Sequence, residues 1–305
     1  QAIEDFLFYA KNNWQTPPAY VLLIGDGHYD SKNYDSGDVG YWNMIPSRIV
    51  DTLYMETGSD EALSDFNKDG LAEIPIGRIP ARDGAAVTTM LNKTITWEAS
   101  LNANSMNRGV LFAHDWPDGY DFKAMSDRVM SNLPAAVPKL SISQTSPTGQ
   151  ADIIAAVNET DGGTTLAPGP NAGQYLLNYT GHGTTGVWRN TGFFSYQQAP
   201  LLTNGNYPSL MVSLTCLNAY FMSNNDSFSE AMVKAPGGAV AVWASTGETT
   251  PDVQEVMGTR FYLKLGEGSI PRIGDLIADA KGPLPAGADV RLSWALIGDP
   301  MLKVR

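Results

Sequence analysis

Short apolar runs alternate with amphipathic segments along most of the chain. Apolar runs of strand length cover residues 20–24, 74–79, 109–113, 138–143, 174–179, 209–215 and 239–244. Segments with helical spacing of apolar positions lie between them, at residues 2–14, 82–101, 121–133 and 150–158. This alternation of buried strands and helices predicts an α/β protein with a mostly parallel sheet.

Capping signals and one polar stretch refine this prediction. Ser227 and Glu230 have the spacing of a capping box, which predicts a helix that runs to Lys234. Pro251 suits the first turn of a further helix. Residues 102–108 are small and polar, and we place a boundary there, between an amino-terminal subdomain (1–105) and a second subdomain (106–305).

Composition and charge exclude some partners. The 305 residues carry 20 Lys and Arg against 32 Asp and Glu, for a net charge of −12, so nucleic acid is not expected as a partner. No stretch is long and apolar enough to predict a membrane span. The chain begins at Gln1, and we expect it to be a processed or excised piece, with a propeptide or accessory domains outside it.

The single cysteine excludes an internal disulfide and a Cys-based zinc site. A lone Cys is more often a small buried hydrophobe than a nucleophile. Cys216, however, ends the apolar run 209–215, and the run 174–179 leads into Gly181-His182-Gly183. The carboxyl ends of parallel strands share one edge of a sheet, where such folds place their ligands. If these strands are neighbours, His182 and Cys216 face one crevice.

That placement suits nucleophilic catalysis. A thiol is mostly protonated at neutral pH and needs a nearby base, which His182 would supply to Cys216. The glycines beside His182 allow a tight turn, and the N–H groups of Gly183 and Cys216 are candidate oxyanion donors.

Two segments here resemble the paired catalytic motifs of the gingipain family of cysteine peptidases, relatives of caspases and legumains. They are residues 178–188 (NYTGHGTTGVW) and 213–221 (SLTCLNAYF), and the segments YVLLIGD (20–26), IGRIP (76–80), AST (244–246) and LIGDP (296–300) also match in the family's order. The resemblance implies a caspase-like αβα sandwich with two adjacent subdomains, of which the second is catalytic. It implies a secreted or cell-surface endopeptidase that acts on peptide or protein substrates through a thioester acyl-enzyme, with no organic cofactor.

The resemblance also implies roles for particular residues. His182 takes the position of the general base and Cys216 that of the nucleophile, while Gly183 and Cys216 supply the oxyanion donors. The carboxylate that orients the histidine follows the strand at 109–113, and Asp115 is the nearest candidate. An ordinary loop aspartate is an equally good interpretation of Asp115.

Substrate specificity is where the chain departs from the family. Asp118 or Asp121 could supply the acidic S1 residue of the Arg-directed members, and Trp188 is expected to line the cleft. The aromatic lid that follows AST in those members is absent, because residues 247–251 read GETTP. Strict Arg specificity is therefore not expected, and Glu248 is a further candidate for recognising a basic side chain.

An acidic loop precedes the strand at 74–79. Its positions one, three, five, seven and nine match a calcium loop of the EF-hand type and are held by Asp65, Asn67, Asp69, Leu71 and Glu73. The twelfth-position Glu is missing, so the loop is not a standard EF-hand. We expect it to bind a structural calcium ion, and the alternative is a polar turn without metal.

Other functions fit parts of the sequence. The same Cys and His pair would serve a sortase-like transpeptidase or processing enzyme. Asp26, His28 and Asp30 follow the strand at 20–24 and leave a metal-dependent hydrolase open. A surface module that keeps the fold without catalysis is the remaining alternative.

Overall fold

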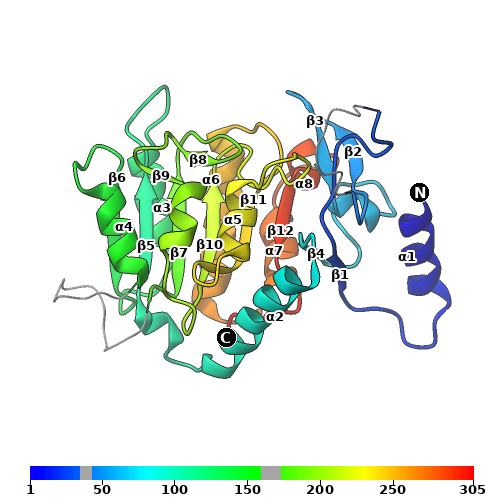
Figure 1. Ribbon diagram of the computed structural model, residues 1–305, viewed down its shortest axis with the longest axis horizontal. Helices are drawn as coiled ribbons and strands as arrows, with labels where there is room; N and C mark the ends of the chain where they lie inside the picture. The colour runs from blue at the N-terminus through cyan, green and yellow to red at the C-terminus, as the bar shows by residue number, and fades with distance from the viewer. Residues whose placement is uncertain (35–42, 159–172) are drawn as a thin grey trace.

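An eight-stranded sheet forms the centre of the protein (Figure 1). The computed structural model describes residues 1–34, 43–158 and 173–305. The strands of the sheet lie in the order β1-β4-β12-β11-β10-β7-β5-β6. Their bounds are β1 Val21–Ile24, β4 Ile76–Ile79, β12 Trp294–Ile297, β11 Ala239–Ser245, β10 Ser209–Leu214, β7 Leu176–Thr180, β5 Val110–His114 and β6 Lys139–Ser143.

The sheet consists of two parallel blocks that run in opposite directions. Strands β11, β10, β7, β5 and β6 are parallel to one another. Strand β12 is antiparallel to β11 and parallel to β4, which in turn is parallel to β1. The carboxyl ends of the larger block therefore share one edge, as the sequence predicts for a mostly parallel sheet.

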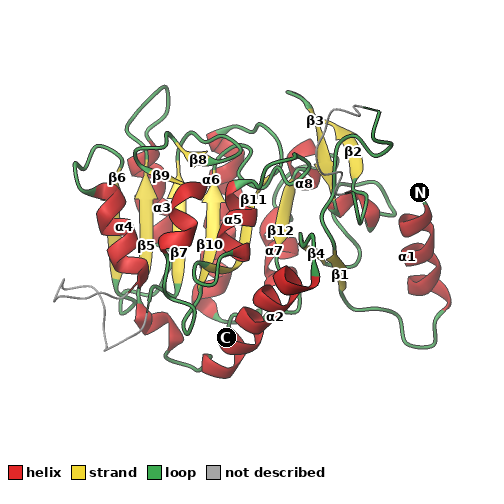
Figure 2. Cartoon of the chain, viewed as in Figure 1, coloured by secondary structure: helices red, strands yellow, loops and turns green. Residues whose placement is uncertain are grey.

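Helices cover both faces of the sheet (Figure 2). Their bounds are α1 Ala2–Asn13, α2 Gly84–Ser100, α3 Phe122–Met130, α4 Gly149–Asn158, α5 Phe228–Lys234, α6 Pro251–Glu267, α7 Ile273–Lys281 and α8 Asp289–Leu292. Alternate residues of β5 enter different cores, with Phe112 in the cluster of α3, α6 and α7 and Leu111 in the cluster of α2, α4 and α5. We call these the α3/α6 layer and the α2/α5 layer.

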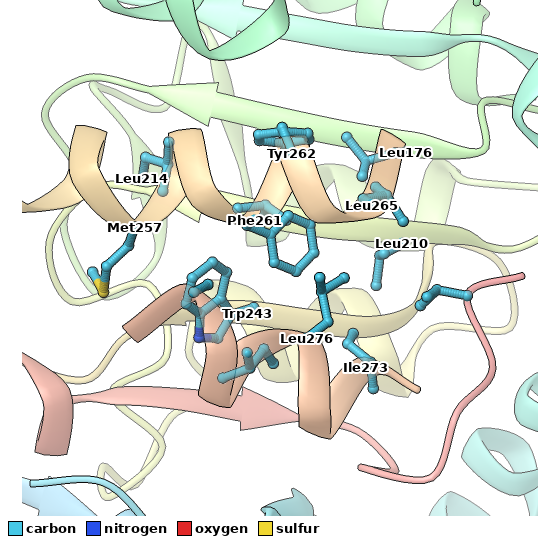
Figure 3. Close-up of a cluster of buried hydrophobic side chains, with 14 of the residues drawn as sticks. Leu176, Leu210, Leu214, Trp243, Met257, Phe261, Tyr262, Leu265, Ile273 and Leu276 are labelled. Atoms are coloured by element: carbon cyan, nitrogen blue, oxygen red, sulfur yellow. The ribbon is translucent and has the colours of Figure 1, made fainter. Parts of the chain in front are cut away.

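The core of the α3/α6 layer is aromatic. Trp243 of β11 stacks on Phe261 of α6, with ring centroids 5.1 Å apart, and Leu276 of α7 lies beside this pair in Figure 3. Tyr262 is fully buried, and its hydroxyl donates a hydrogen bond of 2.9 Å to Asn178 Oδ1 in β7. Helix α6 is thereby fixed against β11 and against β7, the strand that leads to His182.

The expected subdomain boundary lies between α2 and β5, where a short 3₁₀ helix spans Ser105–Arg108. Within the main sheet, the first 105 residues contribute β1 and β4, and β4 meets the larger block only through β12, at Arg78 and Ile297. The same part of the chain carries α1 and the hairpin of β2 (Arg48–Asp51) and β3 (Glu56–Ser59). The division into 1–105 and 106–305 stays a prediction.

Most elements expected from the pattern are present. The capping box of Ser227 and Glu230 forms at the start of α5, and Pro251 opens α6. The pattern did not predict the β2–β3 hairpin, α7 or the short strand β12. No helix in the described ranges is both long and apolar enough to cross a bilayer.

Candidate active site

His182 and Cys216 follow neighbouring strands of the larger block. Strands β7 and β10 pair in parallel, with Thr180 opposite Leu214. Each of the two residues stands two positions beyond this pair, at the same edge of the sheet. The proposed base and nucleophile therefore occupy equivalent positions after adjacent strands, and their roles stay a prediction.

Asn218 ties the turn after Cys216 to the turn after His182. Its side-chain amide donates hydrogen bonds to the carbonyl oxygens of Thr184, at 2.7 Å, and Val187, at 3.2 Å. Leu217 has a φ of +60°, a left-handed conformation that costs free energy for a residue with a Cβ atom. Such local strain persists only where the surrounding contacts hold it, and here it re-aims the chain directly after the nucleophile.

The glycines beside His182 are required by close neighbours. A Cβ atom on Gly181 would lie 2.4 Å from the Tyr179 hydroxyl oxygen and 2.6 Å from Asp115 Cβ. A Cβ atom on Gly183 would lie 2.5 Å from Thr215 Oγ1. The backbone can take this path only without side chains at both positions.

The thiol of Cys216 lies against the segment that leads into α6. Thr249 O accepts from the thiol, and Thr249 N–H donates to it, both at 3.4 Å. Burial raises the pKa of Cys216, and the negative charge of Glu248 raises this pKa further, while the hydrogen bonds with Thr249 lower it. The resting thiol is therefore protonated at neutral pH, and forming the thiolate depends on a base.

The ring of His182 is half exposed at the same edge. Its centroid lies 5.1 Å from that of Phe122 in an edge-on arrangement, so α3 supports one side of the ring. Its Nε2 lies 3.8 Å from Asp118 Oδ2. The hydroxyl of Tyr179 donates a 2.7 Å hydrogen bond to the carbonyl oxygen of His182 and fixes the backbone beneath the ring.

Asp115 and Asp118 contact different parts of this histidine, its backbone and its ring. Asp115 is fully buried, and its Oδ2 accepts from the backbone N–H of His182 at 3.3 Å. Asp118 is instead the carboxylate that lies near Nε2 of the His182 ring. Asp115 therefore holds the turn, and Asp118 is the better placed of the two to orient the imidazole.

Arg189 links both carboxylates. Its Nη1 lies 3.0 Å from Asp118 Oδ2 and 3.4 Å from Asp115 Oδ2, and its guanidinium stacks over Trp116 at 4.3 Å. Its backbone N–H also donates to His182 O at 2.8 Å. Sequence reasoning missed Arg189 and Asn218. The only signal was their nearness in sequence to His182 and Cys216.

Three substrate-binding candidates have different surroundings. Asp121 caps α3 and accepts a 2.9 Å hydrogen bond from Ala124 N–H. Glu248 is exposed and close enough to Cys216 to affect its pKa.

Trp188 is fully buried and stacks on Tyr179 at a centroid distance of 4.8 Å. It belongs to the core of the α2/α5 layer, so its side chain does not line the cleft. An aromatic residue near the GHG turn suggested a cleft position, but the β8–β9 pairing (Val187–Trp188 with Phe194–Ser195) turns it inward.

The loop proposed for calcium brings its carboxylates together. Asp65, Asp69 and Glu73 each offer an oxygen within 4.8 Å of the others, and we call them the loop acid cluster. Asp65 accepts hydrogen bonds from the N–H groups of Asp69 and Gly70, at 3.1 and 3.0 Å. Asn67 Oδ1 accepts from Asp69 N–H at 2.8 Å. Convergent hard oxygen atoms fit a calcium ion in chemical type, and Leu71 would add its carbonyl oxygen.

The residues that left a metal-dependent hydrolase open are already bonded within the protein. Asp26 pairs with Arg82 Nε at 2.6 Å. His28 Nδ1 accepts from Asp30 N–H at 3.0 Å, and its Nε2 lies 2.9 Å from Asn224 Oδ1. The three side chains therefore do not converge on one point as metal ligands.

Asp26 instead groups with Asp226 and Glu230, which we call the buried acid cluster. Lys234 Nζ lies 2.7 Å from Asp226, 2.9 Å from Glu230 and 3.7 Å from Asp26. The ammonium group thus stands where a metal ion would be needed. Burial raises the pKa of Glu230 to about 7, with Asp26 and Asp226 adding to the rise and Lys234 opposing it.

Together, the parallel block and the Cys–His pair at its carboxyl edge define an α/β protein with the layout of a cysteine-nucleophile hydrolase. The profile of Peptidase family C25 matches residues 1–305, and the chain belongs to this family. This match, with the similar proteins and structures that follow, confirms the predicted resemblance to the gingipains and the predicted α/β fold class with a mostly parallel sheet.

Similar proteins agree with this assignment. The chain is 24% identical over 326 residues to Gingipain R2 of Porphyromonas gingivalis, a match that covers all of this chain and 40% of that protein. It is also 24% identical to Gingipain R1 of the same organism, of which it covers 30%. The chain thus spans less than half the length of these curated relatives.

Solved structures show the same fold. The crystal structure of the Arg specific cysteine proteinase gingipain R superposes with a TM-score of 0.79 at 22% identity, over all of this chain and 68% of that one. The separase of Saccharomyces cerevisiae, in its complex with securin, has a TM-score of 0.51 at 12% identity, over 77% of this chain and 14% of that one.

Proposed function

We propose that this chain is the catalytic domain of a cysteine endopeptidase, with Cys216 as nucleophile and His182 as general base. The observation that carries the proposal is the pairing of β7 with β10, which sets both residues at equivalent positions beyond Thr180 and Leu214. Membership of Peptidase family C25 supports it.

In the proposed reaction, His182 takes the proton of the Cys216 thiol as sulfur attacks the carbonyl carbon of the scissile peptide bond. The N–H groups of Gly183 and Cys216 stabilise the negative charge on the carbonyl oxygen. The C–N bond breaks, and His182 gives its proton to the departing amine, which leaves a thioester on Cys216. Water then attacks the thioester, gives a proton to His182 and releases a carboxylic acid, and the proton returns to sulfur.

The protonated resting thiol makes His182 indispensable in this scheme. Burial and the charge of Glu248 both oppose the thiolate at rest. We assign Asp118 to orienting the His182 ring and Asp115 to holding the backbone of the turn, on the contacts described above.

For the side chain that precedes the scissile bond, we propose a basic residue recognised by Glu248. Asp121 is occupied in capping α3, and Asp118 is held by Arg189. Glu248 is exposed and acts on Cys216 through its charge. Arginine specificity is known for the similar gingipain R, and this chain has the sequence GETTP at 247–251 in place of an aromatic lid.

Two further proposals concern the whole protein. We propose a secreted or cell-surface location, because the resemblance to the gingipain family implies it and the net charge of −12 suits such a location. A propeptide is a natural partner, since a complex of pro- and mature domains is known for the similar gingipain RgpB.

We also propose a structural calcium ion at the loop acid cluster. Asp65, Asn67, Asp69 and Glu73 would hold it with side-chain oxygens and Leu71 with its carbonyl. The carbonyl oxygen of Asp69 accepts from Gly287 N–H at 2.7 Å and from Arg291 Nη1 at 2.9 Å, so the ion would fasten the loop to the segment before β12.

The test compares wild type with Cys216→Ala on a peptide library that varies the residue before the scissile bond. We expect cleavage after Lys and Arg by wild type, and loss of cleavage in the variant. A Glu248→Gln variant should lower kcat/KM for basic residues about tenfold while neutral residues change little.

Equal cleavage by wild type and Cys216→Ala would refute the cysteine mechanism. Cleavage that resists thiol reagents but is lost with a chelator would favour a metal-dependent hydrolase instead. A product joined to an added amine would identify a transpeptidase. If wild type forms neither a hydrolysed peptide nor an amine adduct, the chain would be a non-catalytic surface module.

A further inference from the structure

A polar groove of about 610 Å³ lies beside the two catalytic turns. Thr185 and Gly186, on the segment after His182, line one part of it, and residues 223–226, on the segment after Cys216, line another. Tyr196, at the start of the 3₁₀ helix Tyr196–Leu201, forms a third wall. The groove is therefore built from the same segments that carry the proposed base and nucleophile.

The groove lies on the side of the α2/α5 layer. The acidic residues considered for the S1 pocket lie on the side of the α3/α6 layer. Phe228, which begins α5, donates its backbone N–H to Thr185 O at 2.7 Å, and Arg82 directly precedes Asp83, the N-cap of α2. Glu248 leads into α6, and Asp118 leads into α3. Consider a substrate with its scissile bond at Cys216. If the residue before that bond lies on the α3/α6 side, the residues after it continue onto the α2/α5 side.

Charged side chains, among them fully buried Asp26, hold the walls of this groove in place. Arg82 donates to the carbonyl oxygens of Asn224 and Ser223, at 3.0 and 3.4 Å, while its Nε pairs with fully buried Asp26. Asp226 is held by Lys234 at 2.7 Å. A loop fixed in this way needs little reordering on binding, which favours a preformed subsite.

The chemistry of the lining selects its occupant. Thr185, Ser223 and Asn225 contribute hydroxyl and amide groups, and the ring of Tyr196 contributes a flat surface that is 45% exposed. Gly186 lets that ring approach, because a Cβ there would lie 2.9 Å from Tyr196 Cδ1. Polar side chains can hydrogen-bond in such a groove, while large aliphatic ones would desolvate its polar groups without compensation.

We propose that this groove is a subsite for the substrate residues that follow the scissile bond, with preference for polar, hydrogen-bonding side chains. The proposal rests on the peptidase function proposed above and adds to it a determinant of specificity on the leaving-group side. The Tyr196 ring is its central contact.

The experiment uses two substrates with the same residues before the scissile bond. One ends in a coumarin leaving group, and the other extends several polar residues beyond the bond between a fluorophore and a quencher. Tyr196→Ala should lower kcat/KM for the extended peptide roughly tenfold and leave the coumarin substrate within about twofold of wild type. Tyr196→Phe should retain the wild-type values, because it keeps the ring.

Tyr9→Ala is the matched control, since Tyr9 is a similarly exposed tyrosine on α1, with 58% of its surface accessible. It should change neither substrate. In wild type, replacing the polar residues after the bond by leucine should lower kcat/KM for the extended peptide. Equal loss on both substrates in Tyr196→Ala, or no loss on either, would overturn the subsite.

Failure of the proposed function has a different signature. In that case wild type and Cys216→Ala cleave the two substrates equally or not at all. Both the peptidase function and the subsite would then be refuted. Cleavage that depends on Cys216 but ignores Tyr196 would refute the subsite alone.

Discussion

The buried acid cluster and the loop acid cluster each bring three carboxylates together, with oxygens within 4.8 Å of one another. In the buried acid cluster the compensating charges are side chains, Lys234 and Arg82. In the loop acid cluster Asp65 instead receives backbone N–H groups, from Asp69 and Gly70. Backbone donors orient the Asp65 oxygens without cancelling their charge, and Arg291 Nη1 lies at the longer distance of 4.0 Å from Asp69 Oδ1.

This difference teaches that a count of acidic residues does not identify a metal site. A lysine close to three carboxylates makes a cation redundant and would repel one. A loop whose carboxylates are oriented by N–H groups keeps its negative charge available to an ion. The comparison can be tested by removing the internal cation, by adding calcium and by changing pH.

Replacing the internal cation should have the largest effect. Lys234→Met leaves Asp226 and Glu230 without their ammonium partner, and we expect the free energy of unfolding to fall by about 3–5 kcal/mol. Denaturant titration measures this. Lys264→Met removes a comparable lysine from a more exposed pair with Glu267 and should cost at most about 0.5 kcal/mol. Similar losses in the two variants would refute the special role of Lys234.

Calcium should stabilise the protein through the loop acid cluster alone. At free calcium about 100 times Kd, the free energy of unfolding should rise by about 2.7 kcal/mol. Thermal unfolding with calcium and with a chelator measures the shift. Asp65→Asn should abolish the response, and Asp226→Asn should keep it, because Asp226 already has Lys234. A calcium response lost in Asp226→Asn but kept in Asp65→Asn would reverse the comparison.

The smallest expected effect is a pH dependence at Glu230. Its folded-state pKa of about 7 lies above the value of 4.5 for an ordinary glutamate, so the folded protein binds this proton more tightly. The stabilisation of the folded state by this bound proton is complete below about pH 4.5, and it is lost as pH rises through about 7. Wild type should therefore lose stability over this window relative to Glu230→Gln. Parallel stability curves for the two proteins would contradict the shifted pKa.

The sequence predicted the elements that repeat a strong local pattern. Strands β7 and β10 are mainly apolar segments of strand length, and Ser227 with Glu230 is a local capping signal, so all three could be predicted without tertiary contacts. The turns that carry His182 and Cys216 could be placed because parallel strands end at one edge. Strand β12 has only four residues, WALI, and it forms because β4 and β11 provide partners far away in sequence.

The surroundings of the catalytic pair were less accessible to prediction. Asp118 rather than Asp115 lies near the His182 ring because the loop after β5 folds back, and Arg189, 71 residues further along the chain, holds it there. Trp188 is buried because a two-residue pairing with Phe194 turns it toward the core. Neither arrangement follows from a repeating pattern of apolar and polar residues, so it is visible only in the folded structure.

Strand β12 also sets an order of events for a chain made from its amino terminus. It joins β4 to β11, yet of the eight strands in the sheet it is synthesised last. Until residues 294–297 are available, the block of β1 and β4 and the block of five strands have no shared strand between them. Contacts so distant in sequence close slowly. The edges of β4 and β11 therefore stay open for longest during biosynthesis, and they are the place where a chaperone or a neighbouring chain would compete with correct assembly.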